Sequence, residues 1–244
     1  MTGRLVEALA DFNKATELDP NKSEIYINRG NIHKALGNVK LAFRDYDKGL
    51  TLNPADALGY ANRGNLLADE GEPDRALTDY DKAVSLNPLS TVAYLGRGNL
   101  YAARNDVERA LADYEKVIGL TPESPGGYLS RANLYANKGD GQRASDDYNK
   151  AVEVAPDFAL VYVARGEYFK QQGCPEQAVE DFNKAFDLFS GDPGVYIRLS
   201  AAFEELGQKE KAIASLQRAL ELPSDRDTTA WARRQLQTLR STKP

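Results

Sequence analysis

The chain has 244 residues, of which 42% are hydrophobic and 27% charged, and its formal net charge is −5. Its single cysteine excludes an internal disulfide framework and a cysteine zinc site, and its single histidine argues against a catalytic triad or a histidine metal site. The acidic balance predicts no bulk attraction to nucleic acid or anionic lipid, and no apolar run is long enough to span a membrane.

A 34-residue repeat organises most of the sequence. Tyrosine recurs at this interval, at Tyr26, Tyr60, Tyr94, Tyr128, Tyr162 and Tyr196. A fixed period of this size predicts stacked pairs of helices rather than one closed core. We number each repeat from Ser23 as position 1, and we expect a single domain over residues 1–244. Its six full repeats cover residues 23–56, 57–90, 91–124, 125–158, 159–192 and 193–226.

The two ends differ from the repeats between them. Residues 1–22 match only the second half of a repeat, with Ala8 and Phe12 in register, and predict a lone second helix. We therefore expect the sequence to be a fragment of a longer repeat protein. Residues 227–244 follow the last full repeat and predict a C-terminal capping helix over 227–240.

Each repeat predicts two helices with a tight turn between them. Position 15 is glycine in five repeats and Asn105 in the third, as a left-handed helix C-terminus requires. Pro73 and Pro175 follow two residues later in their repeats, which suits the first turn of a second helix. The proline at position 32, such as Pro54, predicts the end of that second helix.

Small and aromatic residues recur at four further positions. Position 8 is Gly, Ala or Ser, position 20 is always Ala, and positions 4 and 24 are mostly aromatic. We expect the helices to approach closely where position 8 faces position 20, with position 4 packing near position 24. These residues resemble the tetratricopeptide repeat family, although Tyr replaces its usual Trp at position 4 and Arg its Leu at position 7. The resemblance implies an all-α fold, a right-handed superhelix (α-α solenoid) of stacked antiparallel helix pairs whose concave groove binds proteins.

A row of asparagines occupies the helix face that lines the groove in that family. Position 9 reads Asn31, Asn65, Asn99 and Asn133 in the first four repeats. A primary amide donates and accepts, so it could hold both polar groups of a peptide unit. With neighbouring helices roughly 8–10 Å apart, one asparagine could meet about every third residue of an extended chain. Alternatively, these amides bond between neighbouring helices and only stabilise the stack. The other candidate peptide-binding residues are Asn28 and Asn62 at position 6 and Leu95 and Leu129 at position 5.

Arginine and aspartate also recur at fixed positions of the repeat. Position 7 is Arg and position 23 is Asp in five repeats, and both change in the sixth, to Leu199 and Ser215. The joint change predicts structural ion pairs, in which a planar guanidinium binds a carboxylate through two hydrogen bonds. The expected pairs are Arg29–Asp45, Arg63–Asp79, Arg97–Asp113, Arg131–Asp147 and Arg165–Asp181. Arginines held in this way would not be free to bind nucleic acid.

Three remaining features favour ordinary structural roles. The charged residues of the last two repeats, Glu167 and Arg198 among them, either select a charged ligand end or form a solvated face. His33 lies at position 11, where other repeats have Leu, Tyr or Phe, and we expect it at the edge of the core. Cys174 precedes a second helix and has no partner base for redox chemistry.

The sequence therefore predicts a non-enzymatic, cytoplasmic scaffold or adaptor. It would hold an extended protein or peptide segment in its groove, with the asparagine row contacting the backbone, and would need no cofactor, metal, nucleic acid or membrane. Two alternatives remain open. One is a module that forms homo-oligomers through its uncapped repeat ends, and the other is the recognition arm of a larger enzyme whose catalytic domain lies outside this sequence.

Overall fold

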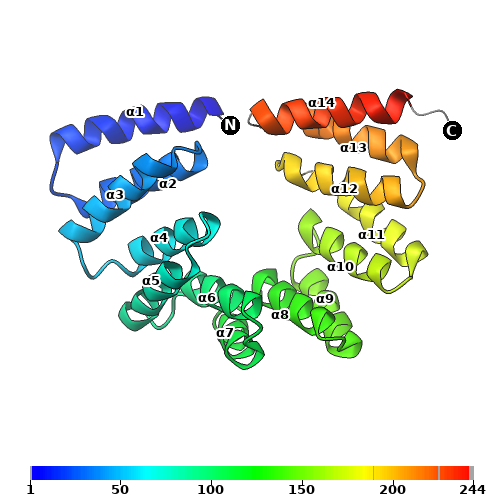
Figure 1. Ribbon diagram of the computed structural model, residues 1–244, viewed down its shortest axis with the longest axis horizontal. Helices are drawn as coiled ribbons and strands as arrows, with labels where there is room; N and C mark the ends of the chain where they lie inside the picture. The colour runs from blue at the N-terminus through cyan, green and yellow to red at the C-terminus, as the bar shows by residue number, and fades with distance from the viewer. Residues whose placement is uncertain (1, 189, 225, 242–244) are drawn as a thin grey trace. The chain divides into compact units, whose positions relative to one another are not determined.

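The computed structural model describes residues 2–188, 190–224 and 226–241, and every regular element within them is an α-helix (Figure 1). The chain divides into two compact units. Unit 1 ends at Pro122, and unit 2 begins at Glu123.

Unit 1 contains the lone first element and three helix pairs. Its helices are α1 (Thr2–Leu18), α2 (Ser23–Ala35), α3 (Val39–Leu52), α4 (Ala57–Asp69), α5 (Pro73–Leu86), α6 (Thr91–Ala103) and α7 (Val107–Leu120). Unit 2 contains three further pairs and a last helix. Its helices are α8 (Pro125–Asn137), α9 (Gly141–Val154), α10 (Ala159–Gln171), α11 (Pro175–Asp187), α12 (Pro193–Glu205), α13 (Lys209–Glu221) and α14 (Arg226–Ser241).

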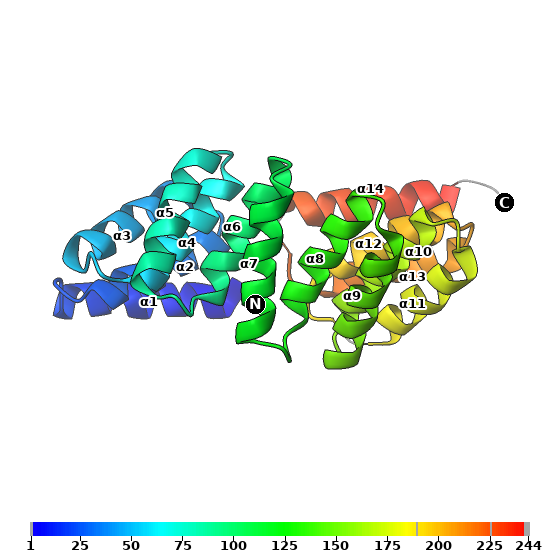
Figure 2. The same ribbon diagram turned by 90° about the horizontal axis from the view of Figure 1, so that it is seen from below.

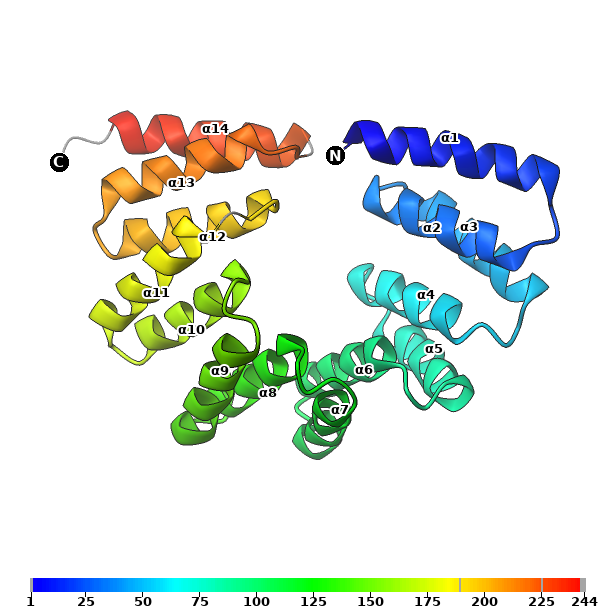
Figure 3. The same cartoon turned by 180° about the vertical axis from the view of Figure 1, so that it is seen from behind.

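The first and second helices of the repeats lie on different faces of each unit. In unit 1, α2 contacts α4 and α4 contacts α6, so the three first helices lie side by side. Figure 3 shows α4 and α6 on the inner side of α5 and α7, and Figure 2 shows the same helices from below. We call the face formed by α2, α4 and α6 the inner face of unit 1. The corresponding inner face of unit 2 is formed by α8, α10 and α12, because α10 contacts both of the others.

The turns between paired helices have the backbone conformation that the sequence predicted. The five glycines of position 15 have φ between 70° and 77°, and Asn105 has a φ of 61°. These are left-handed values, which glycine adopts without strain and asparagine tolerates. Pro73 and Pro175 occupy the first turns of α5 and α11. Sequence alone therefore predicted where the chain reverses.

The small residue of position 8 lies against an aromatic ring of the second helix. A Cβ atom placed on Gly30 would lie 2.8 Å from the ring of Tyr46, and one on Gly64 would lie 2.9 Å from the ring of Tyr80. Position 8 therefore makes room for the aromatic ring of position 24. The ring is fully buried in each case, so the small residue lets the largest side chain of the pair fill the interior. This all-α stack of antiparallel helix pairs confirms the predicted fold class.

Candidate peptide-binding site

Each asparagine of position 9 is hydrogen-bonded to the tyrosine of position 24 in its own repeat. The tyrosine hydroxyl donates, and the amide oxygen Oδ1 of the asparagine accepts. In unit 1 the pairs are Tyr46–Asn31 at 2.7 Å, Tyr80–Asn65 at 2.7 Å and Tyr114–Asn99 at 2.9 Å. In unit 2, Tyr148 donates to Asn133 in the same way. Each position-9 amide oxygen is therefore hydrogen-bonded between the two neighbouring helices of its own repeat, which is the kind of contact that the structural alternative expects.

The tyrosine hydroxyls remain protonated donors at any ordinary pH. All four tyrosine side chains are buried. Burial disfavours the phenolate and raises the pKa of Tyr46, Tyr114 and Tyr148 to about 12, and it raises the pKa of Tyr80 as well. A buried hydroxyl needs an acceptor, and the asparagine oxygen supplies it.

This hydrogen bond leaves the amide nitrogens of the row available. Because an amide group is planar, an oxygen directed at the tyrosine places the Nδ2 group on the other arm, away from the hydroxyl. Among the described residues, none of these four nitrogens has a hydrogen-bond partner. Asn31 and Asn65 are half-buried, and Asn99 and Asn133 are exposed. Each of the four repeats therefore has two amide N–H donors that its packing within the described residues does not use.

The tyrosine partners of the asparagines were not predicted, although the sequence carries a signal for them. In the fifth repeat, position 9 is Glu167 and position 24 is Phe182, which has no hydroxyl. In the sixth repeat the two positions are Ala201 and Leu216. Asparagine and tyrosine are therefore present together or absent together, as in the joint change that indicated the arginine–aspartate pairs.

The other candidate peptide-binding residues lie on the same first helices. Asn28 is exposed and Asn62 half-buried. Leu95 and Leu129 are half-buried, whereas Ile27 and Ala61, at the same position 5 in earlier repeats, are fully buried. Position 5 therefore seals the stack in the first two repeats and reaches the surface in the next two.

A cavity of about 260 Å³ lies on the inner face of unit 2, between α8 and α10. Its lining is polar for the most part. The residues around it are Asn133, Ala136, Asn137, Tyr148, Ala164, Glu167, Tyr168 and Gln171. The cavity shows that position 9 of one repeat and position 9 of the next face a shared hollow between neighbouring first helices.

The charged residues of the last two repeats compensate one another. Arg198 of α12 donates from Nε and an Nη to the two carboxylate oxygens of Glu167 on α10, over 3.1 and 2.6 Å. Lys170 and Glu205 form a second ion pair between the same helices. These four residues therefore present two neutralised pairs on the inner face of unit 2.

The structure also brings each arginine of position 7 together with the aspartate of position 23 in its repeat. In all five pairs Nε and one Nη donate to the two oxygens of the carboxylate, over 2.7 to 2.9 Å. The aspartates are buried, with 1% to 7% of their surface exposed. The hydrogen bonds that Arg63 donates to Asp79 are the main reason that the pKa of Arg63 is raised above its ordinary value. Each of these five guanidinium groups is therefore paired with a carboxylate.

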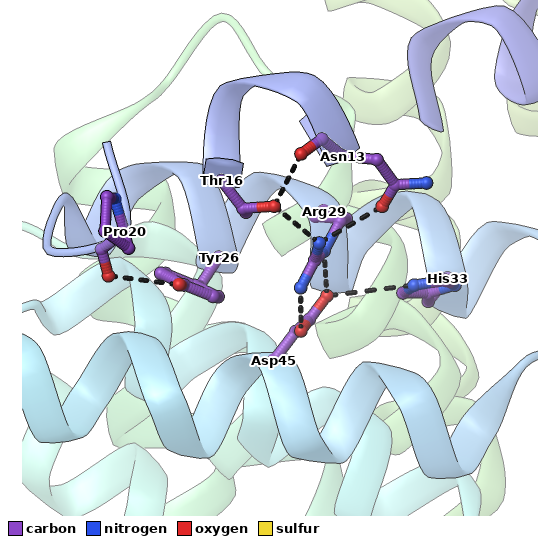
Figure 4. Close-up of polar contacts among 7 residues, drawn as sticks. All are labelled: Asn13, Thr16, Pro20, Tyr26, Arg29, His33 and Asp45. Atoms are coloured by element: carbon purple, nitrogen blue, oxygen red, sulfur yellow. Dashed lines mark hydrogen bonds and ion pairs between the residues drawn. The ribbon is translucent and has the colours of Figure 1, made fainter. Parts of the chain in front are cut away.

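The remaining arginine nitrogen reaches back to the preceding repeat, a contact that the sequence pattern did not predict. Figure 4 shows Arg29 bound to Asp45 and also donating to the Oδ1 of Asn13 and the Oγ1 of Thr16, both on α1. The receiving position recurs along the chain, because Arg63 donates to Asp47, Arg97 to Asp81 and Arg165 to Asn149. In these four repeats, position 7 thus joins two helices of one repeat to the second helix of the repeat before it.

His33 and Cys174 are the remaining chemically distinctive side chains. His33 is 6% exposed, its Nε2 lies 3.8 Å from Oδ2 of Asp45 (Figure 4), and its Nδ1 is buried without a hydrogen-bond partner. Desolvation lowers the pKa of His33. Cys174 is the residue immediately before α11 and is partly exposed.

Two other kinds of feature are absent from the described residues. No cluster of three or more His, Cys, Asp or Glu side chains in that part of the chain could hold a metal ion. No helix in the same residues combines the length and apolar character needed to cross a bilayer.

Comparison with protein families identifies the repeat. A family model described as a tetratricopeptide repeat matches residues 62–125 and 129–193, and a second model with that description matches residues 23–56 and 193–226. A model described as a TPR repeat matches residues 2–37. Together these matches cover most of the chain. A comparison with curated proteins gives no match.

Solved structures show the same fold at low sequence identity. A tetratricopeptide repeat protein from Parabacteroides merdae ATCC 43184 is 21% identical, with a TM-score of 0.72 over 98% of this chain and 94% of that chain. Yeast Tom70 is 20% identical, with a TM-score of 0.74 over 95% of this chain and 49% of that chain. A chain of the APC/C hetero-tetramer Cut9–Hcn1 is 18% identical, with a TM-score of 0.69 over 98% of this chain and 46% of that chain. Similarity at this level establishes the fold alone.

Proposed function

Because this chain belongs to the tetratricopeptide repeat family, whose repeats generally mediate protein–protein interactions, we propose that it is a scaffold that binds an extended peptide segment. The fold is typically a non-catalytic interaction scaffold, and its members bind protein partners. The proposed site is the inner face of unit 1, with Asn31, Asn65 and Asn99 as the backbone-binding residues.

The row of unpartnered amide nitrogens carries this proposal. Three successive first helices of unit 1 each present one amide group whose oxygen is bound and whose two N–H groups have no partner among the described residues. Packing alone does not need these donors, because the bond to tyrosine uses only the oxygen. A peptide backbone supplies one carbonyl acceptor per residue, which makes it a ligand that a regular row of donors fits.

The spacing of the row sets the length of the ligand. Neighbouring packed helices stand roughly 8–10 Å apart, and an extended chain advances about 3.3 Å per residue. One asparagine would then contact the peptide backbone about every three residues, and the three asparagines of unit 1 would span about nine peptide residues.

Apolar side chains beside the row supply surface for the side chains of the ligand. Leu58 at position 2 of α4 is 53% exposed, and Val92 at the same position of α6 is 43% exposed. Leu95 is half-buried on α6. An extended peptide would place alternate side chains toward such residues while its backbone meets the amides, so that affinity and selectivity come from different parts of the site.

The test uses peptides selected on the native chain. A phage-displayed library of peptides about nine residues long would be panned on the full chain, and the strongest peptide would be labelled for fluorescence anisotropy. The decisive variant is Asn31→Asp, Asn65→Asp, Asn99→Asp. An aspartate oxygen still accepts from tyrosine, whereas the N–H donors are lost and replaced by acceptors. Each lost hydrogen bond should cost about fivefold in affinity, so binding should fall at least about a hundredfold.

The matched control makes the same chemical change outside the inner face. In Asn38→Asp, Asn53→Asp, Asn87→Asp the net charge changes equally, and the turn carboxylates of residues 53 and 87 keep the acceptor oxygens for Ala55 and Leu89. This variant should bind the peptide as the native chain does. Equal binding by both triple variants, or failure to select any peptide, would contradict the proposed function.

Self-association is a second candidate function, and one observation favours it. Val6 and Leu18, both on α1, are 58% and 77% exposed. A second copy of the chain could cover this surface. Light scattering measures this directly, because the molar mass would rise with concentration, and a constant monomer mass would exclude this function.

A further inference from the structure

We propose that Tyr46, Tyr80 and Tyr114 are positioning residues that give the asparagine row its polarity. By fixing each amide oxygen inward, they make the inner face of unit 1 select backbone carbonyl oxygens of the partner rather than its N–H groups. The inference rests on the proposed function and adds to it the chemistry that the row recognises.

The tyrosine hydroxyl determines the orientation of the asparagine amide because the amide oxygen is the acceptor that it reaches. A tyrosine hydroxyl can donate or accept, and an asparagine amide can turn over to match either choice. Each of the three tyrosines is buried, and the acceptor that its hydroxyl reaches within the described residues is the Oδ1 of its own asparagine. A buried O–H group without an acceptor destabilises the folded state by about 1–3 kcal/mol. The favoured arrangement is therefore the one in which the hydroxyl donates to Oδ1.

The consequence of this arrangement is a row of donors. With Oδ1 held by the hydroxyl, the two N–H groups of each amide lie on the arm directed away from the second helix. The side chain is also immobilised before the ligand arrives, which lowers the entropy that binding must remove. A partner that approaches the inner face therefore meets donors in the same orientation in three successive repeats.

The fifth repeat shows what the side chains do when the orienting hydroxyl is absent. Position 24 is Phe182, which is fully buried, so a phenyl ring fills the same space as the tyrosine ring. Position 9 is Glu167, which has no N–H to orient and instead accepts from Arg198. The amide occurs only where a hydroxyl can direct it.

The test removes the hydroxyls and keeps the rings. In the triple variant Tyr46→Phe, Tyr80→Phe, Tyr114→Phe, the asparagine amides are free to turn over. The phenyl rings still fill the space of the tyrosine rings. The probe is the labelled peptide of about nine residues selected on the native chain. Loss of preorganisation should weaken its binding about twofold per repeat and about tenfold in the triple variant.

The matched control removes three other hydroxyls from the same repeats. Tyr26, Tyr60 and Tyr94 lie at position 4, and the hydroxyl of Tyr26 donates to the carbonyl oxygen of Pro20 at 3.0 Å (Figure 4). The variant Tyr26→Phe, Tyr60→Phe, Tyr94→Phe should bind the peptide within about twofold of the native chain, because it leaves the oriented amides intact. Circular dichroism confirms that each variant is helical. If the triple variant does not fold, Tyr80→Phe, Tyr114→Phe, which should weaken binding about fourfold, is compared with Tyr60→Phe, Tyr94→Phe.

The outcomes separate this inference from the proposed function. If the Asn→Asp variant loses binding and the position-24 Tyr→Phe variant binds like the native chain, the asparagines bind the ligand without orientation by tyrosine, and the inference is wrong. If the Asn→Asp variant also binds like the native chain, the proposed function fails together with it. Weaker binding by the position-24 variant and native binding by the position-4 variant supports both.

Discussion

The aspartate of position 23 and the arginine of position 7 are each tolerable in the interior only because the other is present. Asp79 is 5% exposed, and the guanidinium of Arg63 binds both of its carboxylate oxygens. A buried charge without a partner is strongly destabilising, whereas removing both charges together can be nearly neutral. The sixth repeat shows the second case, because Leu199 and Ser215 fill these positions and the hydroxyl of Ser215 donates to a backbone carbonyl.

Arg63→Leu is therefore expected to be far more harmful than the double change. The single variant leaves Asp79 buried without its main partner and should lower the free energy of unfolding by about 3 kcal/mol. Arg63→Leu with Asp79→Ser reproduces the sixth repeat and should recover most of that loss. Urea unfolding followed by circular dichroism measures both, and a double variant no more stable than the single one would show that the pair itself carries the stability.

We expect His33 to make the stability of the first full repeat fall in mild acid. Burial lowers the pKa of this imidazole below its ordinary value of about 6.5, Arg29 and Arg44 act in the same direction, and Asp45 opposes them. The unfolded chain therefore takes up a proton at a higher pH than the folded chain. Protonation of His33 therefore does not affect the free energy of unfolding above about pH 6.5, and the free energy of unfolding decreases as the pH falls below that value.

His33→Leu, which copies Leu67 at the same position of the next repeat, should reduce this dependence. The variant avoids the cost of the unpartnered Nδ1 and should unfold at higher urea concentration than the native chain, with the larger difference near about pH 5. Denaturation at about pH 7.5 and about pH 5 gives both values. A difference that is the same at the two pH values would contradict the assigned role of His33.

At the scale of the element, the turn between paired helices depends on one left-handed residue. Gly71 has a φ of 77°, and a Cβ atom added to it would meet nothing within 4 Å, so only backbone conformation restricts this position. Asn105 occupies the equivalent place with a φ of 61° and still leads into α7. Substitutions at this position therefore measure the free-energy cost of a left-handed backbone without any contribution from a steric clash.

Gly71→Ala should lower the free energy of unfolding by about 1 kcal/mol, and Gly71→Asn should lower it less, because asparagine tolerates the left-handed region. The converse variant, Asn105→Gly, should be slightly stabilising. Thermal unfolding of the three variants ranks them, and equal melting temperatures for the alanine and asparagine variants would contradict this account.

At the scale of the whole molecule, each repeat of a unit contacts its neighbours in sequence. The abundant helix contacts join paired helices or adjacent repeats, and the arginine of position 7 adds a polar link to the repeat before it. Stability in such a stack is approximately the sum of repeat and nearest-neighbour terms. Unit 1 and unit 2 each contain three helix pairs, which is enough to form stacked interfaces between repeats.

Residues 1–122 and residues 123–244 should therefore each fold when expressed alone. Each half should show the circular dichroism spectrum of a helical protein and unfold cooperatively. The first half should also bind the selected peptide, since it contains Asn31, Asn65 and Asn99. A half that is unfolded in isolation would show that the repeats need more neighbours than their own unit supplies.

The sequence by itself determined the architecture, because its information is local and repeated. Helix length, the left-handed turn at Gly71 and Asn105, and the phase of the 34-residue period each depend on residues close together in the chain, and six copies reinforce one another. It also indicated which arginine should meet which aspartate, because both are absent from the sixth repeat.

Only the tertiary structure decided how the inner-face side chains are oriented. Whether Asn65 presents its oxygen or its nitrogen depends on where the hydroxyl of Tyr80 lies across the helix pair, and no spacing in the sequence gives that direction. The same holds for Gly64, which packs against the ring of Tyr80, and for Arg63, whose third nitrogen reaches Asp47 of the preceding repeat. Periodicity places a residue on a face of its helix, but the packing of neighbouring helices decides which atoms of that residue are already bound and which remain for a partner.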